Sequence, residues 1–178
     1  DGYINSFSQT FPLISDDRSI EHKFTNAMYH TLGDNIILSA QLYINTINSL
    51  DDNVRISKRV FVPSRRLRGF EGGKIGPKDG TQYIGGNYAT ALNLNSTLPN
   101  IFFENENLDF NLFMDLANVW EVDYDSSLDD KSTIRSSTGV ALNLMTPIGP
   151  LSFSFANALS KASSDKTESF RFNLGTQF

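Results

Sequence analysis

Apolar and polar residues alternate along the chain with a period of two. Within residues 110–116 one parity is apolar throughout and the other is mostly polar, namely Phe110, Leu112, Met114 and Leu116 against Asn111, Phe113 and Asp115. The same alternation recurs in 140–145, 151–155 and 170–178. It places apolar side chains on one face of a sheet and polar or small side chains on the other. No helical period persists, so the pattern predicts an all-β protein.

Eight segments carry this alternation, separated by turn-forming or polar residues. The connectors 32–34 and 147–149 are tight, whereas 48–80 and 121–131 are long and polar. Short turns at one rim and longer loops at the other are typical of outer-membrane barrels, whose strands are antiparallel. The expected strands are 2–13, 18–31, 34–47, 81–97, 106–120, 132–146, 149–160 and 166–178.

Soluble β-sandwiches and lipocalin-like barrels also have strands with alternating apolar and polar residues. The many polar residues on the face that would form their core argue against both folds. A soluble core with this parity would bury many polar groups, and each costs free energy unless it finds a partner. The pattern is explained if the polar residues face a wet lumen and the aromatic residues face lipid. We therefore expect an antiparallel transmembrane β-barrel with the following residues inside: Asn111, Asp115, Asn143, Ser152, Ser154, Arg171, Asn173 and Gln177.

Composition narrows the classes of function. The formal net charge of −5 lacks the basic excess of nucleic-acid binders, so we expect no nucleic-acid partner. The absence of cysteine excludes disulfides, thiolate metal sites and cysteine nucleophiles. The sequence contains neither an apolar run long enough for a membrane helix nor a signal peptide. Asp1-Gly2 leads directly into a strand, so we expect a segment cut from a longer protein.

Three blocks stand out from the alternation. The first is Leu67-Arg68-Gly69-Phe70, followed by Lys74-Ile75-Gly76-Pro77, and the second is Phe113-Met114-Asp115-Leu116-Ala117. The third comprises 149–154 and the end of the chain, 170–178, where an alternating strand finishes on an aromatic residue. In this order and spacing they resemble the BamA-type family of outer-membrane assembly proteins over nearly all of the chain. The family's tetrad is Val/Leu-Arg-Gly-Phe/Tyr, and its strand motif has Gly where Ala117 stands here.

The resemblance implies where the chain belongs in a larger fold. Residues 1–178 would be the C-terminal transmembrane β-barrel region, with eight strands that make up half of a sixteen-stranded barrel. The periplasmic POTRA domains and the first strands would lie outside this chain. The implied location is the bacterial outer membrane, in contact with outer-membrane lipid or lipopolysaccharide.

The tetrad also has a physical interpretation. Arg68 carries a planar, permanently charged group that suits bidentate pairing with a carboxylate. Gly69 permits a close backbone approach or a positive φ, and Phe70 supplies an apolar anchor. Asp115 has lumen parity, so Arg68 and Asp115 are expected to hold the loop inside the barrel, a contact that the resemblance also implies. Family members often carry a second carboxylate, a Glu on the strand after the loop, where Asn93 stands here.

The resemblance implies a non-enzymatic function, the insertion and folding of outer-membrane proteins, with no cofactor, catalytic residue or metal. The partners would be unfolded outer-membrane proteins, and assembly lipoproteins bound through the POTRA domains. The last strand would act at a seam by pairing with an incoming strand. Gly175 would weaken that strand and ease opening. The seam residues are Phe170, Phe172, Leu174, Gly175 and Phe178.

Two alternatives remain at this point. One is a passive pore or polypeptide-secretion channel of the same superfamily, and the other is a truncated eight-stranded barrel without activity. Unpaired strand edges cannot remain in hydrocarbon, so we expect the isolated chain to close as an eight-stranded monomer in preference to forming a larger ring with a second copy. The lumen would then hold side chains only, and loop 48–80 would be displaced from it.

The remaining motifs do not indicate a metal, phosphate or calcium site. His22 and His30 lack further ligands nearby, and Gly69–Lys74 lacks the spacing and the Ser or Thr of a phosphate loop. The acidic stretch lacks the glycine and the final Glu of an EF-hand, so we expect a solvated loop from Asp123, Asp125, Asp129 and Asp130. Trp120, with Tyr124 nearby, is expected at the membrane interface.

Overall fold

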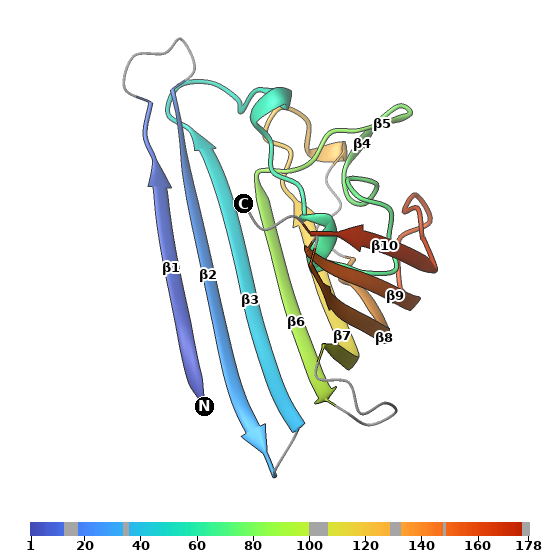
Figure 1. The fold of residues 1–178 in the computed structure, drawn as a ribbon. Helices are drawn as coiled ribbons and strands as arrows, with labels where there is room; N and C mark the ends of the chain where they lie inside the picture. Colours follow the sequence, from blue (N-terminus) through green and yellow to red (C-terminus); the bar gives the residue numbers. More distant parts are fainter. Residues whose placement is uncertain (13–17, 34–35, 100–106, 129–132, 148, 176–178) are drawn as a thin grey trace.

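One antiparallel sheet of eight strands dominates the computed structural model (Figure 1), in the order β1-β2-β3-β6-β7-β8-β9-β10. The structure describes residues 1–12, 18–33, 36–99, 107–128, 133–147 and 149–175. No helix in these ranges is long and apolar enough to cross a membrane. The strands of the sheet are β1 (Gly2–Thr10), β2 (Ser19–Leu32), β3 (Ile36–Ser49), β6 (Tyr88–Pro99), β7 (Leu108–Trp120), β8 (Arg135–Thr146), β9 (Gly149–Ser160) and β10 (Phe170–Leu174).

The predicted all-β fold is confirmed, and two of the strands, the fourth and the last, begin several residues later than the alternation indicated. The fourth begins at Tyr88 because the preceding residues form a separate hairpin, β4 (Lys78–Asp79) with β5 (Gln82–Tyr83). The last begins at Phe170 because residues 166–168 bond to a loop instead of to the neighbouring strand. Both departures come from long-range contacts that a local pattern does not contain. The final residues of the predicted strand, 176–178, lie outside the described ranges.

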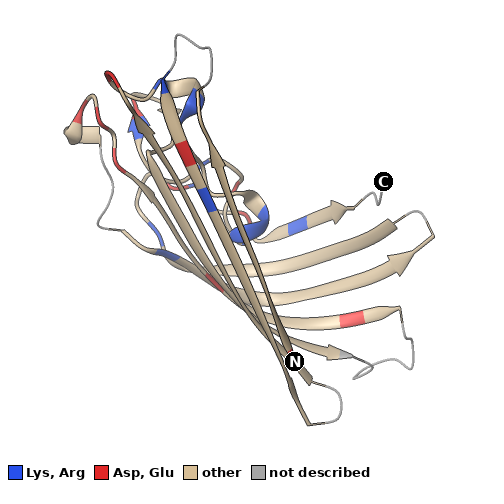
Figure 2. Cartoon of the chain, turned by 90° about the vertical axis from the view of Figure 1, so that its left-hand side faces the viewer, with Lys and Arg blue, Asp and Glu red and all other residues tan. Residues whose placement is uncertain are grey.

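The outward face of the sheet is apolar across the strands. Tyr3, Met28, Ala40, Leu94 and Met114 are successive register partners on β1, β2, β3, β6 and β7. Figure 2 shows that the strands are mostly uncharged along their length, with charged residues gathered at one rim and in the loops. An apolar, exposed face of this kind is what lipid requires.

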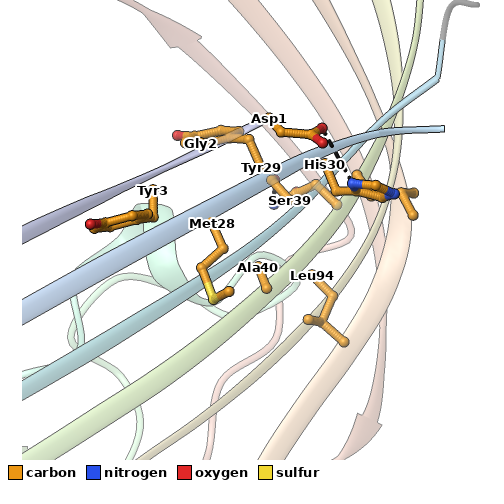
Figure 3. Close-up of a pocket in the computed structure, with 11 residues that line it drawn as sticks. Asp1, Gly2, Tyr3, Met28, Tyr29, His30, Ser39, Ala40 and Leu94 are labelled. Atoms are coloured by element: carbon orange, nitrogen blue, oxygen red, sulfur yellow. Dashed lines mark hydrogen bonds and ion pairs between the residues drawn. The ribbon is translucent and has the colours of Figure 1, made fainter.

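An apolar depression lies on this outward face near the start of β1. It encloses about 800 Å³, and Tyr3, Met28, Ala40 and Leu94 contribute side chains to it (Figure 3). The small side chain of Ala40 lies between two long ones, which hollows the surface at that point. Asp1 and His30 also line it, and His30 contacts the Asp1 carboxylate at 3.2 Å. The depression therefore has a mostly apolar lining, with Asp1 and His30 as its polar part.

The apolar core lies on the other face, between the sheet and the segment that joins β3 to β6. This segment, residues 50–87, is called the inner loop below. It contains the β4–β5 hairpin and two short 3-10 helices, η1 (Ile56–Lys58) and η2 (Ser64–Arg66), and a third, η3 (Ser126–Leu128), follows β7. The buried cluster joins loop residues to sheet residues: Val54, Val60, Val62, Leu67, Phe70 and Ile75 with Tyr43, Ile47, Ala89, Ala91, Ala117 and Val119.

Small residues let the inner loop approach the sheet closely. Ala89, Ala91 and Ala117 are each no more than 3% exposed beneath the loop. Gly76 has a φ of +87°, and a Cβ there would lie 2.3 Å from Cγ1 of Val119. Any larger residue at position 76 would therefore meet both backbone strain and a steric clash. The loop packs against the sheet wall as a structured element.

The sheet is open, which corrects the expectation that the chain closes as an eight-stranded barrel. β1 and β10 lie at opposite ends of the strand order, and no pairing joins their described residues. The inner loop occupies the space that closure would remove. Closing the sheet would force the loop out and break its contacts, so the loop and the closed eight-stranded form exclude each other.

Candidate functional site

A row of polar residues crosses the inner face where the loop touches it. Gln41 on β3, Asn93 on β6, Asp115 on β7 and Ser137 on β8 are successive register partners. Side chains of directly opposed residues on neighbouring strands point to the same face of a sheet, so all four point inward. The register of four strands thus places one carboxylate, two amides and a hydroxyl side by side.

Arg68 of the inner loop binds Asp115 through three hydrogen bonds. The Nε atom donates to Oδ2 at 2.7 Å, and Nη2 donates to Oδ1 at 2.6 Å. The backbone N–H of Arg68 also donates to Oδ2 at 3.0 Å. This fork geometry is the strongest form of a carboxylate–guanidinium contact. The structure therefore brings together the two residues that the sequence paired.

Neighbouring side chains complete the surroundings of this ion pair. Asn93 donates to Oδ1 of Asp115 at 2.8 Å and to the Arg66 carbonyl at 2.9 Å. Nη2 of Arg68 also donates to Asn95 at 2.8 Å, and its guanidinium lies 3.5 Å from the ring centroid of Phe113. Asp115 is fully buried, whereas the Arg68 side chain is 17% exposed. Asn93 therefore supplies Asp115 with a hydrogen bond and adds no second negative charge.

Gly69 and Phe70 lie where the loop comes closest to β8 and β9. Gly69 has a φ of +86°, and a Cβ there would lie 3.1 Å from Ala156 and 3.2 Å from Ser137. The Ser137 hydroxyl donates to the Arg68 carbonyl, and the Phe70 side chain is 1% exposed. Only glycine combines this backbone conformation with so little space. Leu67 is buried as well, at 2% exposure.

The inner loop also binds the connection between β9 and β10, residues 161–169, which is called the terminal loop below. Phe70 and Thr167 form an antiparallel bridge, and the Glu168 N–H donates to the Gly69 carbonyl at 3.1 Å. Arg171 on β10 donates to the Ser64 carbonyl at 2.6 Å and to the Phe70 carbonyl. Gly69 is therefore bonded to the terminal loop, and Phe70 is bonded both to this loop and to the last strand of the sheet.

A second buried ion pair, which sequence reasoning missed, anchors the terminal loop. Nε of Arg135 donates to Asp165 Oδ2 at 2.9 Å, and neither side chain is exposed. Asp165 also accepts from the Ala162 N–H at 2.7 Å and from Gly76 at 3.4 Å. The one available signal was that Arg135 shares the inward parity of the strand that it begins.

A third contact, near the loop-bearing rim, adds to the expectation of a solvated acidic loop: Asp123 and Asp125 are exposed, but Asp123 is also held by three neighbours. Asp123 accepts hydrogen bonds from Arg59, from Asn87 at 3.0 Å and from the Val54 N–H at 2.7 Å. Burial alone would raise the pKa of Asp123, but these hydrogen bonds and the Arg59 charge outweigh it and hold the pKa below its usual value. Asp125 remains exposed, and Asp129 and Asp130 lie outside the described residues.

The predicted seam residues lie at one end of the sheet. Phe170, Phe172 and Leu174 point outward and are 47%, 49% and 51% exposed. Phe170 and Phe172 lie against Phe155 and Phe153 of β9, with ring centroids 5.0 and 5.1 Å apart. β10 ends directly before Gly175, whose N–H still donates to Pro150 at 2.8 Å. Phe178 lies outside the described residues.

The remaining candidates from the sequence are dispersed. His22 stacks on Phe7 with ring centroids 6.3 Å apart, whereas His30 is beside Asp1. Within the described ranges no group of acidic or histidine side chains could hold a metal ion. Trp120 packs on Tyr88 at 5.8 Å between centroids, and Tyr124 lies under the Arg59 guanidinium.

An open antiparallel sheet, apolar outside and polar inside, with a loop held against its inner face, has the architecture of an outer-membrane β-barrel wall. Comparison with known proteins then gives the family. The model of the Omp85 superfamily domain matches residues 1–178, so the chain belongs to the Omp85 superfamily of bacterial outer-membrane proteins.

Two of the proteins that this chain is similar to are BamA proteins. The crystal structure of BamA from Haemophilus ducreyi lacking POTRA domains 1-3 matches with a TM-score of 0.91 and 27% identity, over 99% of this chain and 38% of that chain. The outer membrane protein assembly factor BamA of Neisseria meningitidis serogroup B is 30% identical over 139 residues, which is 63% of this chain and 17% of the relative. The resemblance to BamA-type proteins, the barrel fold and the outer-membrane location are thus confirmed. The chain spans well under half the length of either relative.

Proposed function

We propose that the protein containing this chain assembles other proteins into the outer membrane, and that β10 is the strand at which it acts. Its relatives named above include an assembly factor. The observation that carries the proposal is the position of β10, a five-residue strand at the end of the sheet, with β9 as its one neighbour among the strands that the structure describes. An edge strand presents unpaired backbone groups to which an incoming strand can bond.

The inner loop would control that edge. It bonds to β10 through Arg171 and to the terminal loop through Thr167 and Glu168. It is held to the barrel wall by Arg68 on Asp115. If a longer barrel opens beside β10, any movement of β10 would therefore also act on the bonds between the inner loop, β10 and the terminal loop. No cofactor or covalent chemistry enters this mechanism.

We also propose that residues 1–178 are the C-terminal part of a longer barrel, with POTRA domains in the part of the protein that precedes them. The open sheet supports this, because both edges need partners in hydrocarbon. The partners would be unfolded outer-membrane proteins at β10, assembly lipoproteins at the POTRA domains, and lipid or lipopolysaccharide around the outer face.

The test is to capture substrate at β10 in the complete protein. A photo-reactive amino acid replaces Phe172, and an unfolded outer-membrane protein is presented to the complete protein in lipid vesicles. The control replaces Leu112, which also points outward and has a similar exposure, 44% against 49%. Leu112 is on β7, which is paired with a strand on each side and is not an edge strand. We expect substrate adducts at position 172 and few at position 112.

Equal capture at the two positions would contradict the proposal, because it would mean that substrate meets the outer face without preference for the edge. A passive pore would give ion conductance without adducts at either position. Folding of the substrate, followed in the same vesicles, shows whether the captured protein is being assembled.

A further inference from the structure

Three arginines of the inner loop meet at one cavity on the inner face. Arg65, Arg66 and Arg68 line a cavity of about 390 Å³ together with Gln41, Asn93 and Asn95. Every one of these side chains has N–H groups that can donate hydrogen bonds. The cavity is therefore rich in donors and positively charged.

Asp115, the carboxylate beside the cavity, already has hydrogen-bond partners. Both oxygens of Asp115 accept hydrogen bonds from Arg68, and Oδ1 accepts another from Asn93. Arg68 is therefore paired, and elsewhere in the described chain these arginines also have a carboxylate within ion-pair distance: Arg18, Arg59, Arg135 and Arg171. Arg65 and Arg66 make no ion pair with any residue that the structure describes. Two positive charges thus remain without a counter-charge at one place.

Arg66 is held in position by neutral groups. Its Nη1 donates to Gln41 at 2.8 Å and to Asn93 at 3.3 Å, and its guanidinium lies 5.7 Å from the ring centroid of Tyr43. Its Nε is buried and has no hydrogen-bond partner in the structure. A buried donor without a partner is costly, and a guanidinium fork is shaped for two oxygens of one anion. Burial, followed by the charge of Arg65, also lowers the pKa of Arg66, which an adjacent anion would reverse.

From these contacts we propose that the cavity is a binding site for a small oxyanion, a phosphate or carboxylate group, held by Arg66 with Arg65. The ligand enters from the aqueous lumen. The neutral amides of Gln41 and Asn93 hold the Arg66 guanidinium in place, so that ligand binding orders few additional side chains. This inference is independent of the assembly function proposed above.

The test is a calorimetric titration of the complete protein in uncharged detergent with inorganic phosphate, and separately with acetate, at low salt. Low salt matters because competing ions screen partly exposed charges. We expect saturable binding of at least one of the two anions with one ion per protein. Arg66→Gln should weaken it by about tenfold or more, because a hydrogen bond from a charged donor is lost.

Arg55→Gln is the matched control, since it removes the same charge from an exposed position of the same loop outside the cavity. It should change the affinity by less than about threefold. If Arg66→Gln does not fold, the exposed Arg65→Gln gives the same comparison. Absence of binding of both anions to the wild-type protein would overturn the proposal, as would equal losses in the cavity variant and in Arg55→Gln.

Discussion

Replacing Asp115 by Ala should lower the free energy of unfolding by about 3–5 kcal/mol, the usual cost of removing one partner of a buried ion pair. Arg68→Ala should cost a similar amount, because it leaves a fully buried carboxylate with Asn93 as its remaining side-chain partner. The two changes should not add. Their coupling, measured by a double-mutant cycle on the complete protein in lipid vesicles, should be well above the roughly 0–1 kcal/mol of an exposed pair.

The chain offers a matched control for this cycle. Arg18 and Asp51 form an ion pair with a 3.1 Å contact, but their side chains are 60% and 49% exposed. The same substitutions there should show coupling of roughly 1 kcal/mol or less. If the two cycles give the same coupling, Arg68 does not hold the inner loop to Asp115, and the loop is retained by the apolar cluster and the terminal loop alone.

Leu112→Arg should cost about 2–4 kcal/mol of folding free energy in lipid vesicles, the range for a charge on the lipid face near the membrane midplane. Leu112 lies in the middle of β7, points outward and is 44% exposed. The penalty arises because the guanidinium would lose water without gaining a partner.

The control for Leu112→Arg is Asn143→Arg on the inner face of β8. Asn143 is half-buried and faces the lumen, where an added arginine can remain hydrated. Asn111 is a poorer control, because it is 6% exposed and its Oδ1 accepts from Thr97 at 2.6 Å. Equal losses at Leu112 and Asn143 would mean that the outward face does not contact lipid.

Local alternation was sufficient to predict which face of each strand is apolar. The parity that places Leu112 outside and Asp115 inside is a property of consecutive residues, and the structure keeps it along β7. The Arg68–Asp115 pair could also be predicted, because the tetrad and the strand motif each carry their own signature. Its neighbours Asn93 and Asn95 followed once the register between β6 and β7 was known.

What could not be predicted depends on contacts between distant segments. Arg135 and Asp165 are 30 positions apart, and Arg59 and Asp123 are 64 apart, so no local pattern links them. The same cause shortened β10, because the backbone around Thr167 bonds to the inner loop instead of to the sheet. The open sheet was missed because the cost of unpaired strand edges was weighed above the contacts of the inner loop, and the alternation does not show the buried cluster that joins that loop to the sheet.

The central claim is that residues 1–178 form an open wall of a larger barrel, with β1 and β10 apart. It can be measured by thiol cross-linking in the membrane-embedded complete protein, since this part of it has no native cysteine. Cysteine replaces Phe172 on β10 together with, in turn, Tyr3, Asn5 or Phe7 on β1, and a short bifunctional reagent is added. Phe153 with Phe172, which are direct register partners, provides the positive control. The account predicts efficient cross-links within one chain for the control pair and none for the three β1–β10 pairs. Cross-links within one chain between β1 and β10, as efficient as those of the control, would contradict it.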